Sequence, residues 1–158
     1  MMDIVFLRHG KAEGRQENLC DKQRKLVQEG RQKTLKTAEK LKKRILHSPI
    51  TIISSPAIRA LQTALILKET LQTQNFNVVD AVYTGDTVAL KQEIENLESY
   101  GTCIIVGHEP LLSDWLREIF GLHSHIKKSG YVTVRKTEDN KYHIVEVRRA
   151  VILPHMQE

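Results

Sequence analysis

The stretch Ile4-Val5-Phe6-Leu7-Arg8-His9-Gly10 starts with four hydrophobic residues and ends in an arginine, a histidine and a glycine. Its short hydrophobic part, β-branched at two positions, is typical of a buried strand. A second stretch, Cys103-Ile104-Ile105-Val106, runs into Gly107-His108-Glu109-Pro110. Because ligands of open α/β sheets bind outside the carboxyl ends of the strands, both histidines are candidate site residues.

The residue types at the first strand end suit a phosphate group. Arg8 offers a planar fork of donors that matches phosphate oxygens, and the imidazole of His9 can attack phosphorus or donate to its oxygens near neutral pH. Gly10 permits the close approach of a ligand. We therefore expect a phosphate site that joins His9 and His108.

A third segment adds a second arginine. Ser54-Ser55-Pro56 precedes Arg59, which is expected in the first turns of a helix, where backbone N–H groups favour anions. Gln62 and Thr63 are expected to order this helix rather than to touch substrate. Glu109 is expected to face solvent or to favour the N-terminus of the helix that follows it.

Hydrophobic patterning predicts strands alternating with helices. Strands are expected at residues 4–7, 50–54, 76–82 and 103–106, and helices at 26–46, from 56, at 88–97 and from 110. Two further strands, 130–135 and 142–147, flank the turn residues 138–140 as a hairpin. This order predicts a three-layer α/β/α sandwich with a mostly parallel central sheet, the hairpin at one edge, and a single domain over residues 1–158.

Helical spacing also predicts which faces are apolar. Trp115 and Cys103 are expected in the core. The expected apolar faces of the first two helices consist of Leu35, Ala38, Leu41, Ile45 and Leu46, and of Ala60, Leu61, Ala64, Leu65, Leu67 and Leu71.

Composition limits the partners. The net charge of +5 over 158 residues suits anionic substrates, but no zinc-finger spacing or basic strip with interleaved aromatics is present, so we expect no nucleic-acid partner. No apolar stretch reaches membrane-spanning length, which predicts no membrane association. The two cysteines make no disulfide framework, and no secretory signal is seen, so a cytoplasmic location is expected. The pair His123 and His125 is expected in a polar loop.

Together, the three segments resemble the histidine phosphatase (phosphoglycerate mutase-like) superfamily, most closely its small SixA-type phosphohistidine phosphatases. The segment Asp21-Lys22-Gln23-Arg24-Lys25-Leu26-Val27-Gln28-Glu29-Gly30 is similar to D-x-x-R-P-L-T-x-x-G of that group. Likewise, Ser54-Ser55-Pro56-Ala57-Ile58-Arg59-Ala60-Leu61-Gln62-Thr63 is similar to S-S-P-x-x-R-A-x-Q-T. The likeness runs over residues 2–116. Lys25 and Val27 depart from it, which bears only on the geometry of this loop.

The resemblance implies the histidine phosphatase fold and a role for each site residue. His9 would be the nucleophile that takes the phosphoryl group, Arg8 and Arg59 would clamp its oxygens, and His108 would donate a further hydrogen bond. Gly10 is also expected to border the substrate, and Arg24 is expected either to rim the pocket or to lie in a solvated loop. Two guanidiniums and an imidazole can stabilise the transferred group without a metal, so we expect no cofactor.

The interval that holds a general acid in larger superfamily members contains Glu69, Asp80, Asp86, Glu93 and Glu95, none of them in a recognisable motif. A general acid raises the reaction rate by about 10²–10⁴-fold, which a sugar or serine alkoxide needs as a leaving group. Imidazole is a better leaving group and depends less on such an acid. The expected reaction is therefore removal of phosphate from phosphohistidine in proteins through a phosphohistidine enzyme intermediate. A phosphotransfer domain or phosphocarrier is the expected partner, and the chain is expected to be a monomer.

Three alternatives stay open at this point. A small-molecule phosphomonoesterase or mutase of the same superfamily would share the site. A non-catalytic phosphate-binding domain would bind phosphate without turnover, whereas loss of turnover with retained binding in a His9→Ala variant is expected only for an enzyme. A nucleic-acid-binding protein would show steep salt dependence.

Overall fold

The computed structural model of the chain describes residues 1–45, 47–97 and 100–154. Six strands form one sheet in the order β3-β2-β4-β1-β5-β6. Their bounds are β1 (Met2–Arg8), β2 (Ile50–Ser54), β3 (Asn75–Val78), β4 (Gly101–Gly107), β5 (Ser124–Lys136) and β6 (Tyr142–Ile152). The helical segments are η1 (Asp21–Gln23), α1 (Gln28–Arg44), α2 (Ile58–Leu71), α3 (Ala81–Thr84), α4 (Thr87–Glu95) and α5 (Leu111–Phe120).

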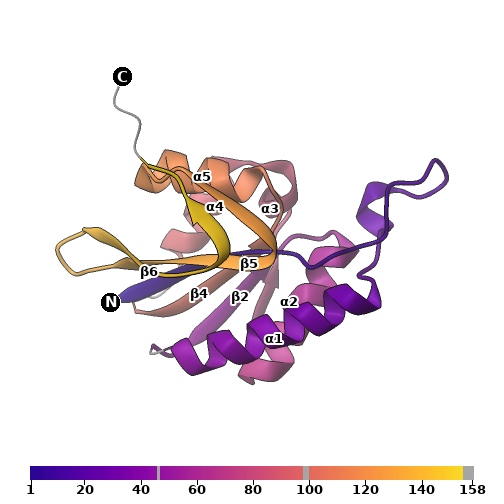
Figure 1. Ribbon diagram of the computed structural model, residues 1–158. Coiled ribbons are helices and arrows are strands. Elements are labelled where there is room, and N and C mark those ends of the chain that lie inside the picture. The colour runs from indigo at the N-terminus through magenta and orange to yellow at the C-terminus, as the bar shows by residue number, and fades with distance from the viewer. Residues whose placement is uncertain (46, 98–99, 155–158) are drawn as a thin grey trace.

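The sheet is mostly parallel. β1 pairs in parallel with β4, and β2 with both β4 and β3, whereas β5 is antiparallel to β1 and to β6. Helices α1 and α2 cover one face, and α3, α4 and α5 cover the other (Figure 1). The expected α/β/α sandwich with an edge hairpin is confirmed.

Alternation along the central strands builds a core on each face of the sheet. Phe6 and Ile105 pack in the cluster under α5, and Val5 and Ile104 pack in the cluster under α1 and α2. Strands covered on both faces read as continuous hydrophobic runs, which is why β1 and β4 were recognisable. Trp115 and Cys103 lie in the core, as predicted.

The face of α1 differs from the prediction. Leu35 is 45 % exposed, while Thr34 and Thr37 are buried. Thr34 Oγ1 lies 2.9 Å from Ser129 Oγ, and Thr37 Oγ1 donates to the Ser129 carbonyl at 2.7 Å, so hydrogen bonds to β5 offset the burial of these hydroxyls. The helix begins at Gln28 rather than at residue 26. The predicted position of Leu46 lies outside the described residues.

Other elements also depart from prediction. On α2, Leu65 is 51 % exposed. The expected strand over residues 76–82 is wrong at its end: β3 stops at residue 78 and α3 follows, closed by Gly85 with φ of 84°. α2 and α5 start just after the prolines expected to begin them. The hairpin strands are longer than expected, so His125, predicted in a loop, lies in β5.

No helix in the described part of the chain is long and apolar enough to cross a membrane.

Candidate active site

His9 follows β1 and is buried at the carboxyl rim of the sheet. Its backbone N–H donates to the Gly107 carbonyl at 3.0 Å, which ties the ends of β1 and β4 together. The ring Nδ1 lies 2.7 Å from the Gly10 carbonyl, an acceptor only, so Nδ1 carries the hydrogen. Burial lowers the pKa of His9 to about 3. The hydrogen bond to Gly10 raises this pKa, whereas His108, Arg59 and Arg8 lower it further. The imidazole is therefore neutral at pH 7, with its lone pair on Nε2.

His108 follows β4, and its tautomer is set by Ser55. Ser55 Oγ accepts the Ala57 N–H at 3.2 Å and lies 2.8 Å from His108 Nε2. Burial, with nearby Arg59, lowers the pKa of His108 to about 4, so its ring is neutral. Among the described residues the Ser55 hydroxyl has no other acceptor, and we infer that it donates to Nε2, which leaves the hydrogen of His108 on Nδ1. That Nδ1 is buried without a hydrogen-bond partner in the described chain.

Two arginines are each held at one end of the guanidinium. Arg8 Nη1 donates to the Ile126 carbonyl of β5 at 3.1 Å. Arg59, in the first turn of α2, donates from Nη1 to the Asp21 carbonyl at 2.8 Å and from Nη2 to Asp21 Oδ2 at 3.0 Å. In both arginines the buried Nε finds no partner among the described residues. Each guanidinium thus keeps its Nε edge for another acceptor.

These groups meet in one place. The rings of His9 and His108 lie 5.1 Å apart between centroids, and both arginines are near enough to lower the pKa of both histidines. Buried donors without acceptors are rare because they cost free energy. Two guanidinium edges, one N–H of His108 and the lone pair of His9 together suit a tetrahedral anion that an imidazole attacks.

A carboxylate that sequence reasoning did not assign lies beside the arginines. Asp21 accepts hydrogen bonds from Arg59, from Arg24 Nη1 at 2.8 Å and from the Tyr83 hydroxyl at 2.8 Å. Burial would raise the pKa of Asp21, but these three donors hold it well below its ordinary value. The motif over residues 21–30, which begins with Asp21, is the sequence signal that could have identified this carboxylate. Nothing local marked Tyr83, whose ring packs edge-on against His108 at 5.5 Å.

Arg24 and the backbone of Gly10 are held by hydrogen bonds to other groups of the protein. Arg24 donates from Nε to the Glu13 carbonyl at 2.7 Å as well as to Asp21. The Gly10 N–H donates to Thr63 Oγ1 at 3.0 Å, so this N–H is engaged within the protein. A Cβ on Gly10 would lie 2.6 Å from Thr34 Oγ1, which explains the glycine.

Two polar residues of α2 hold the loop that follows β1. Thr63 Oγ1 accepts from Gly10 and donates to the Arg59 carbonyl at 2.7 Å. Gln62 Oε1 accepts the Leu26 N–H at 2.7 Å. Through these contacts α2 fixes the position of the loop that follows β1, a role that the sequence did not show.

Glu109 is not solvent-facing: its side chain is 7 % exposed. The carboxylate accepts the Ser113 N–H at 2.9 Å, which confirms the predicted role at the N-terminus of α5, and the Ile126 N–H at 3.1 Å. It lies 3.6 Å from His125 Nδ1. Within the described residues no group of three His, Cys, Asp or Glu side chains is placed to hold a metal ion.

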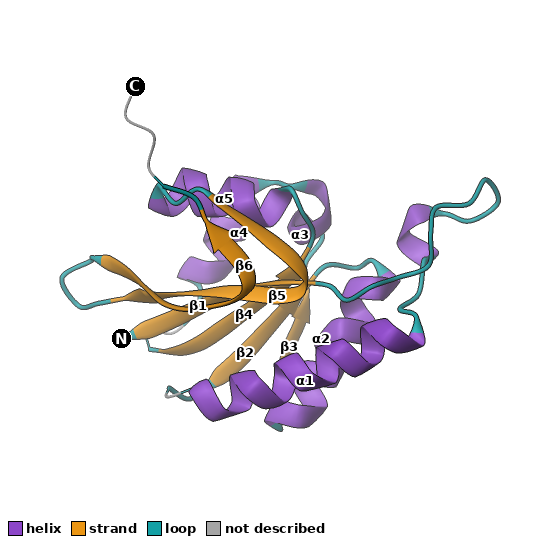
Figure 2. Ribbon diagram, in the orientation of Figure 1, coloured by secondary structure: helices purple, strands orange, loops and turns teal. Residues whose placement is uncertain are grey.

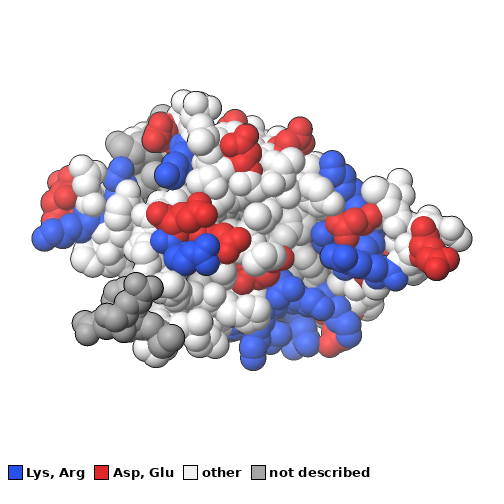
Figure 3. All heavy atoms as spheres, turned by 90° about the horizontal axis from the view of Figure 1, so that it is seen from above, with Lys and Arg blue, Asp and Glu red and all other residues white. Residues whose placement is uncertain are grey.

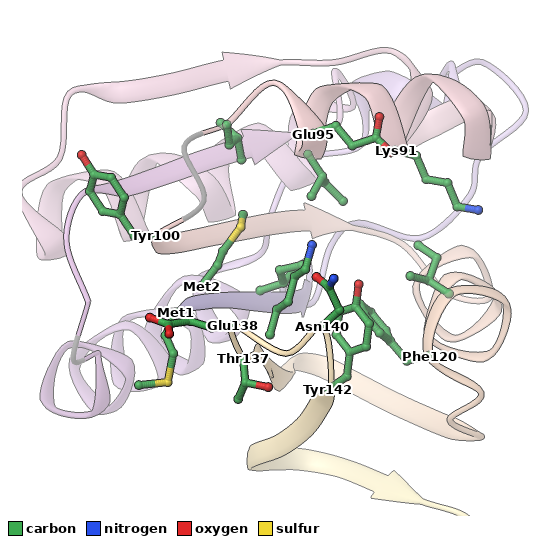
Figure 4. Close-up of a pocket in the computed structure, with 15 residues that line it drawn as sticks. Met1, Met2, Lys91, Glu95, Tyr100, Phe120, Thr137, Glu138, Asn140 and Tyr142 are labelled. Carbon is green, nitrogen blue, oxygen red and sulfur yellow. The ribbon is translucent and has the colours of Figure 1, made fainter.

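A cavity of about 850 Å³ opens at the opposite end of the sheet (Figure 4). It is lined by Met2 at the start of β1, Phe120 at the end of α5 and Tyr142 at the start of β6. Among the described residues, its lining includes neither His9 nor His108. This cavity is therefore separate from the candidate site at the carboxyl rim of the strands.

Comparison with known proteins finds relatives in sequence and in fold. Residues 4–81 match the Histidine phosphatase superfamily (branch 1). An uncharacterized protein of Picosynechococcus sp. is 31 % identical over 141 residues, covering 85 % of each chain. The solved structure of the protein histidine phosphatase SixA with tungstate has a TM-score of 0.78 at 19 % identity, covering 93 % of this chain and 96 % of that one. A mycobacterial glucosyl-3-phosphoglycerate phosphatase with VO₃ has a TM-score of 0.69 at 16 % identity, covering 90 % and 96 %.

The fold and the sequence relatives together define a phosphatase. The chain belongs to the histidine phosphatase superfamily, and its fold is that of the SixA structures.

Proposed function

We propose that the protein removes phosphate from phosphohistidine in a partner protein, with His9 as the nucleophile. Arg8 and Arg59 clamp the phosphoryl oxygens through their Nε edges, and His108 donates from Nδ1. Arg24 borders the site through Asp21. A phosphotransfer domain or a phosphocarrier is the proposed class of partner.

The reaction proceeds in two displacements. The lone pair of His9 Nε2 forms a bond to phosphorus while the P–N bond of the substrate breaks. The leaving imidazole, already protonated on its other ring nitrogen, keeps that electron pair and departs as a neutral ring. Water then attacks the phosphorus on His9, releasing inorganic phosphate and restoring the neutral ring. Both steps gain from charge stabilisation on the equatorial oxygens.

The observation that carries the choice of substrate is the state of Asp21. This carboxylate lies beside Arg59, and its low pKa keeps it ionised at neutral pH, so it has no proton to donate. A sugar or serine alkoxide leaves poorly without a general acid, whereas imidazole leaves without one. The likeness of the fold to SixA, named as a protein histidine phosphatase, supports the same choice.

The test compares a histidine-phosphorylated phosphotransfer domain, a phosphoserine peptide and p-nitrophenyl phosphate, each with EDTA present. We expect fast release of phosphate from the phosphohistidine protein and slow release from phosphoserine. His9→Ala should abolish turnover, and His143→Ala, an exposed histidine on β6, should not. Preferred hydrolysis of the phosphoserine peptide would instead identify a phosphomonoesterase. Binding of phosphate without turnover of any substrate would identify a non-catalytic domain.

A further inference from the structure

Strand β5 extends beyond the end of β1 and forms an irregular segment there. The last pair between the two strands is Leu7 with Tyr131, so residues 124–130 run past the end of β1. Here the pairing with β6 jumps from Ile126–Ala150 to Tyr131–Arg148. Residues 127–130 of β5 thus oppose residue 149 alone, and both strands turn sharply at this bulge (Figure 2).

Hydrogen bonds hold the bulge against the candidate active site. Immediately before it, the Ile126 carbonyl accepts Arg8 Nη1. Within it, the Ser129 N–H donates to the His9 carbonyl at 3.2 Å. The buried Ser129 is in turn held by Thr34 and Thr37 of α1. The bulge is therefore a fixed border of the site.

Its exposed side chains are cationic. Lys127, Lys128 and Arg149, here called the basic bulge, are all exposed. Arg149 takes up a backbone φ of 49° and donates from Nε to the Lys128 carbonyl at 3.2 Å.

The charge of the basic bulge is not offset locally. Within the described residues, none of its three side chains forms an ion pair, whereas Lys11 and Lys33 both pair with Glu29. Figure 3 shows groups of Lys and Arg side chains on the face seen from above, several of them beside Asp or Glu side chains. Three uncompensated cations therefore lie beside the site.

We propose that the basic bulge docks an acidic surface of the phosphorylated partner, next to its phosphohistidine. This inference rests on the proposed function and names the chemistry of the partner. A small phosphorylated compound reaches only the phosphate clamp, whereas a protein also brings neighbouring carboxylates within the Debye length of about 8–10 Å. Complementary charge of this kind raises the rate of encounter and selects partners.

The test reverses the charge of the bulge and leaves the catalytic residues intact. Lys127→Glu/Lys128→Glu is compared with Lys42→Glu/Lys43→Glu, an exposed lysine pair at the C-terminal end of α1 that gives the same change in net charge. The two substrates are phosphohistidine as the free amino acid and a histidine-phosphorylated phosphotransfer domain with an acidic surface. We expect kcat/KM for the domain to fall about tenfold or more in the bulge variant alone. For the free amino acid we expect changes below about threefold in both variants.

Several results would overturn the docking surface. These are an equal loss on both substrates, the same loss in the α1 variant, or no dependence of the domain reaction on salt. Salt-dependent binding of DNA that the bulge variant loses would assign the surface to nucleic acid instead. If the wild type cleaves only p-nitrophenyl phosphate, the proposed function fails. Titration of the phosphorylated domain into His9→Ala, with and without the bulge substitutions, then still decides the docking surface: weaker binding in the bulge variant supports it, and equal binding refutes it.

Discussion

The hydroxyl of Ser55 lies 2.8 Å from Nε2 of His108, and a hydrogen bond donated by Ser55 leaves Nδ1 of His108 as the donor toward the candidate site. The two residues lie 53 positions apart, one after β2 and the other after β4. A neutral imidazole has a single N–H, so the partner of one nitrogen decides what the other can do.

Ser55→Ala should therefore lower kcat by about 10- to 100-fold, the equivalent of one hydrogen bond to a charged group, about 1.5–3 kcal/mol. Ser54→Ala is the matched control, because Ser54 is equally buried but donates to the Ser55 carbonyl instead. Its kcat should change by less than about threefold. Steady-state kinetics on p-nitrophenyl phosphate make the comparison, and equal losses in the two variants would contradict it.

The tautomer itself can be measured in the wild type. Nitrogen-15 chemical shifts of His108 should show a protonated Nδ1 and an unprotonated Nε2 at neutral pH. A protonated Nε2 in the ligand-free protein would refute the role given to Ser55, whatever the stability of the variant.

Asp21→Asn should reduce kcat/KM by about tenfold, since Arg59 loses the carboxylate that turns its Nε edge toward the site. Tyr83→Phe is the control, because it removes one donor from the same carboxylate and leaves the Arg59 pair intact. Its kcat/KM should stay within about threefold of wild type. An unaffected Asp21→Asn enzyme, or equal damage in both, would show that Asp21 does not position Arg59.

Acid should destabilise the ligand-free protein. The pKa of His9 is lowered to about 3 and that of His108 to about 4, mainly by burial. An unfolded histidine, with its ordinary pKa of about 6.5, takes up a proton at higher pH than these folded ones. The unfolded state thus binds more protons below pH 6.5, and stability falls as pH drops toward 4 and then 3.

Urea unfolding should show a free energy of unfolding lower by about 1–3 kcal/mol at pH 5 than at pH 7. The double variant His9→Gln/His108→Gln lacks both groups and should show a smaller drop. The same drop in variant and wild type would mean that other residues cause it.

Gly30→Ala should destabilise the protein by about 1–3 kcal/mol, as overpacking does. A Cβ on Gly30 would collide with the Lys11 carbonyl oxygen and lie 2.9 Å from the Lys11 nitrogen, pushing α1 off the loop after His9. Gly14→Ala is the control, because nothing described lies within 4 Å of the added Cβ. Thermal unfolding should separate the two, and equal melting temperatures would contradict the steric argument.

Local sequence determined the strands, the main helices and the residues at their ends. Strands β1 and β4 could be predicted because each is a continuous hydrophobic run that ends at Arg8 and His9 or at Gly107 and His108. Strand burial and the position of a strand end are both encoded within a few residues. The same locality misled the prediction of α1, where Thr34 and Thr37 are buried only because β5 supplies their hydrogen-bond partners.

Only the tertiary structure decided how the site is oriented. Asp21 meets Arg59 across 38 positions, Ser55 meets His108 across 53, and the carbonyl of Ile126 meets Arg8 across 118. Such contacts exist once the strands have assembled side by side, because the chain must close long loops before the hydrogen bonds can form. The sequence thus determined which groups are candidates for the chemistry, and the assembled sheet decided which nitrogen of each one is engaged within the protein and which is left for a ligand.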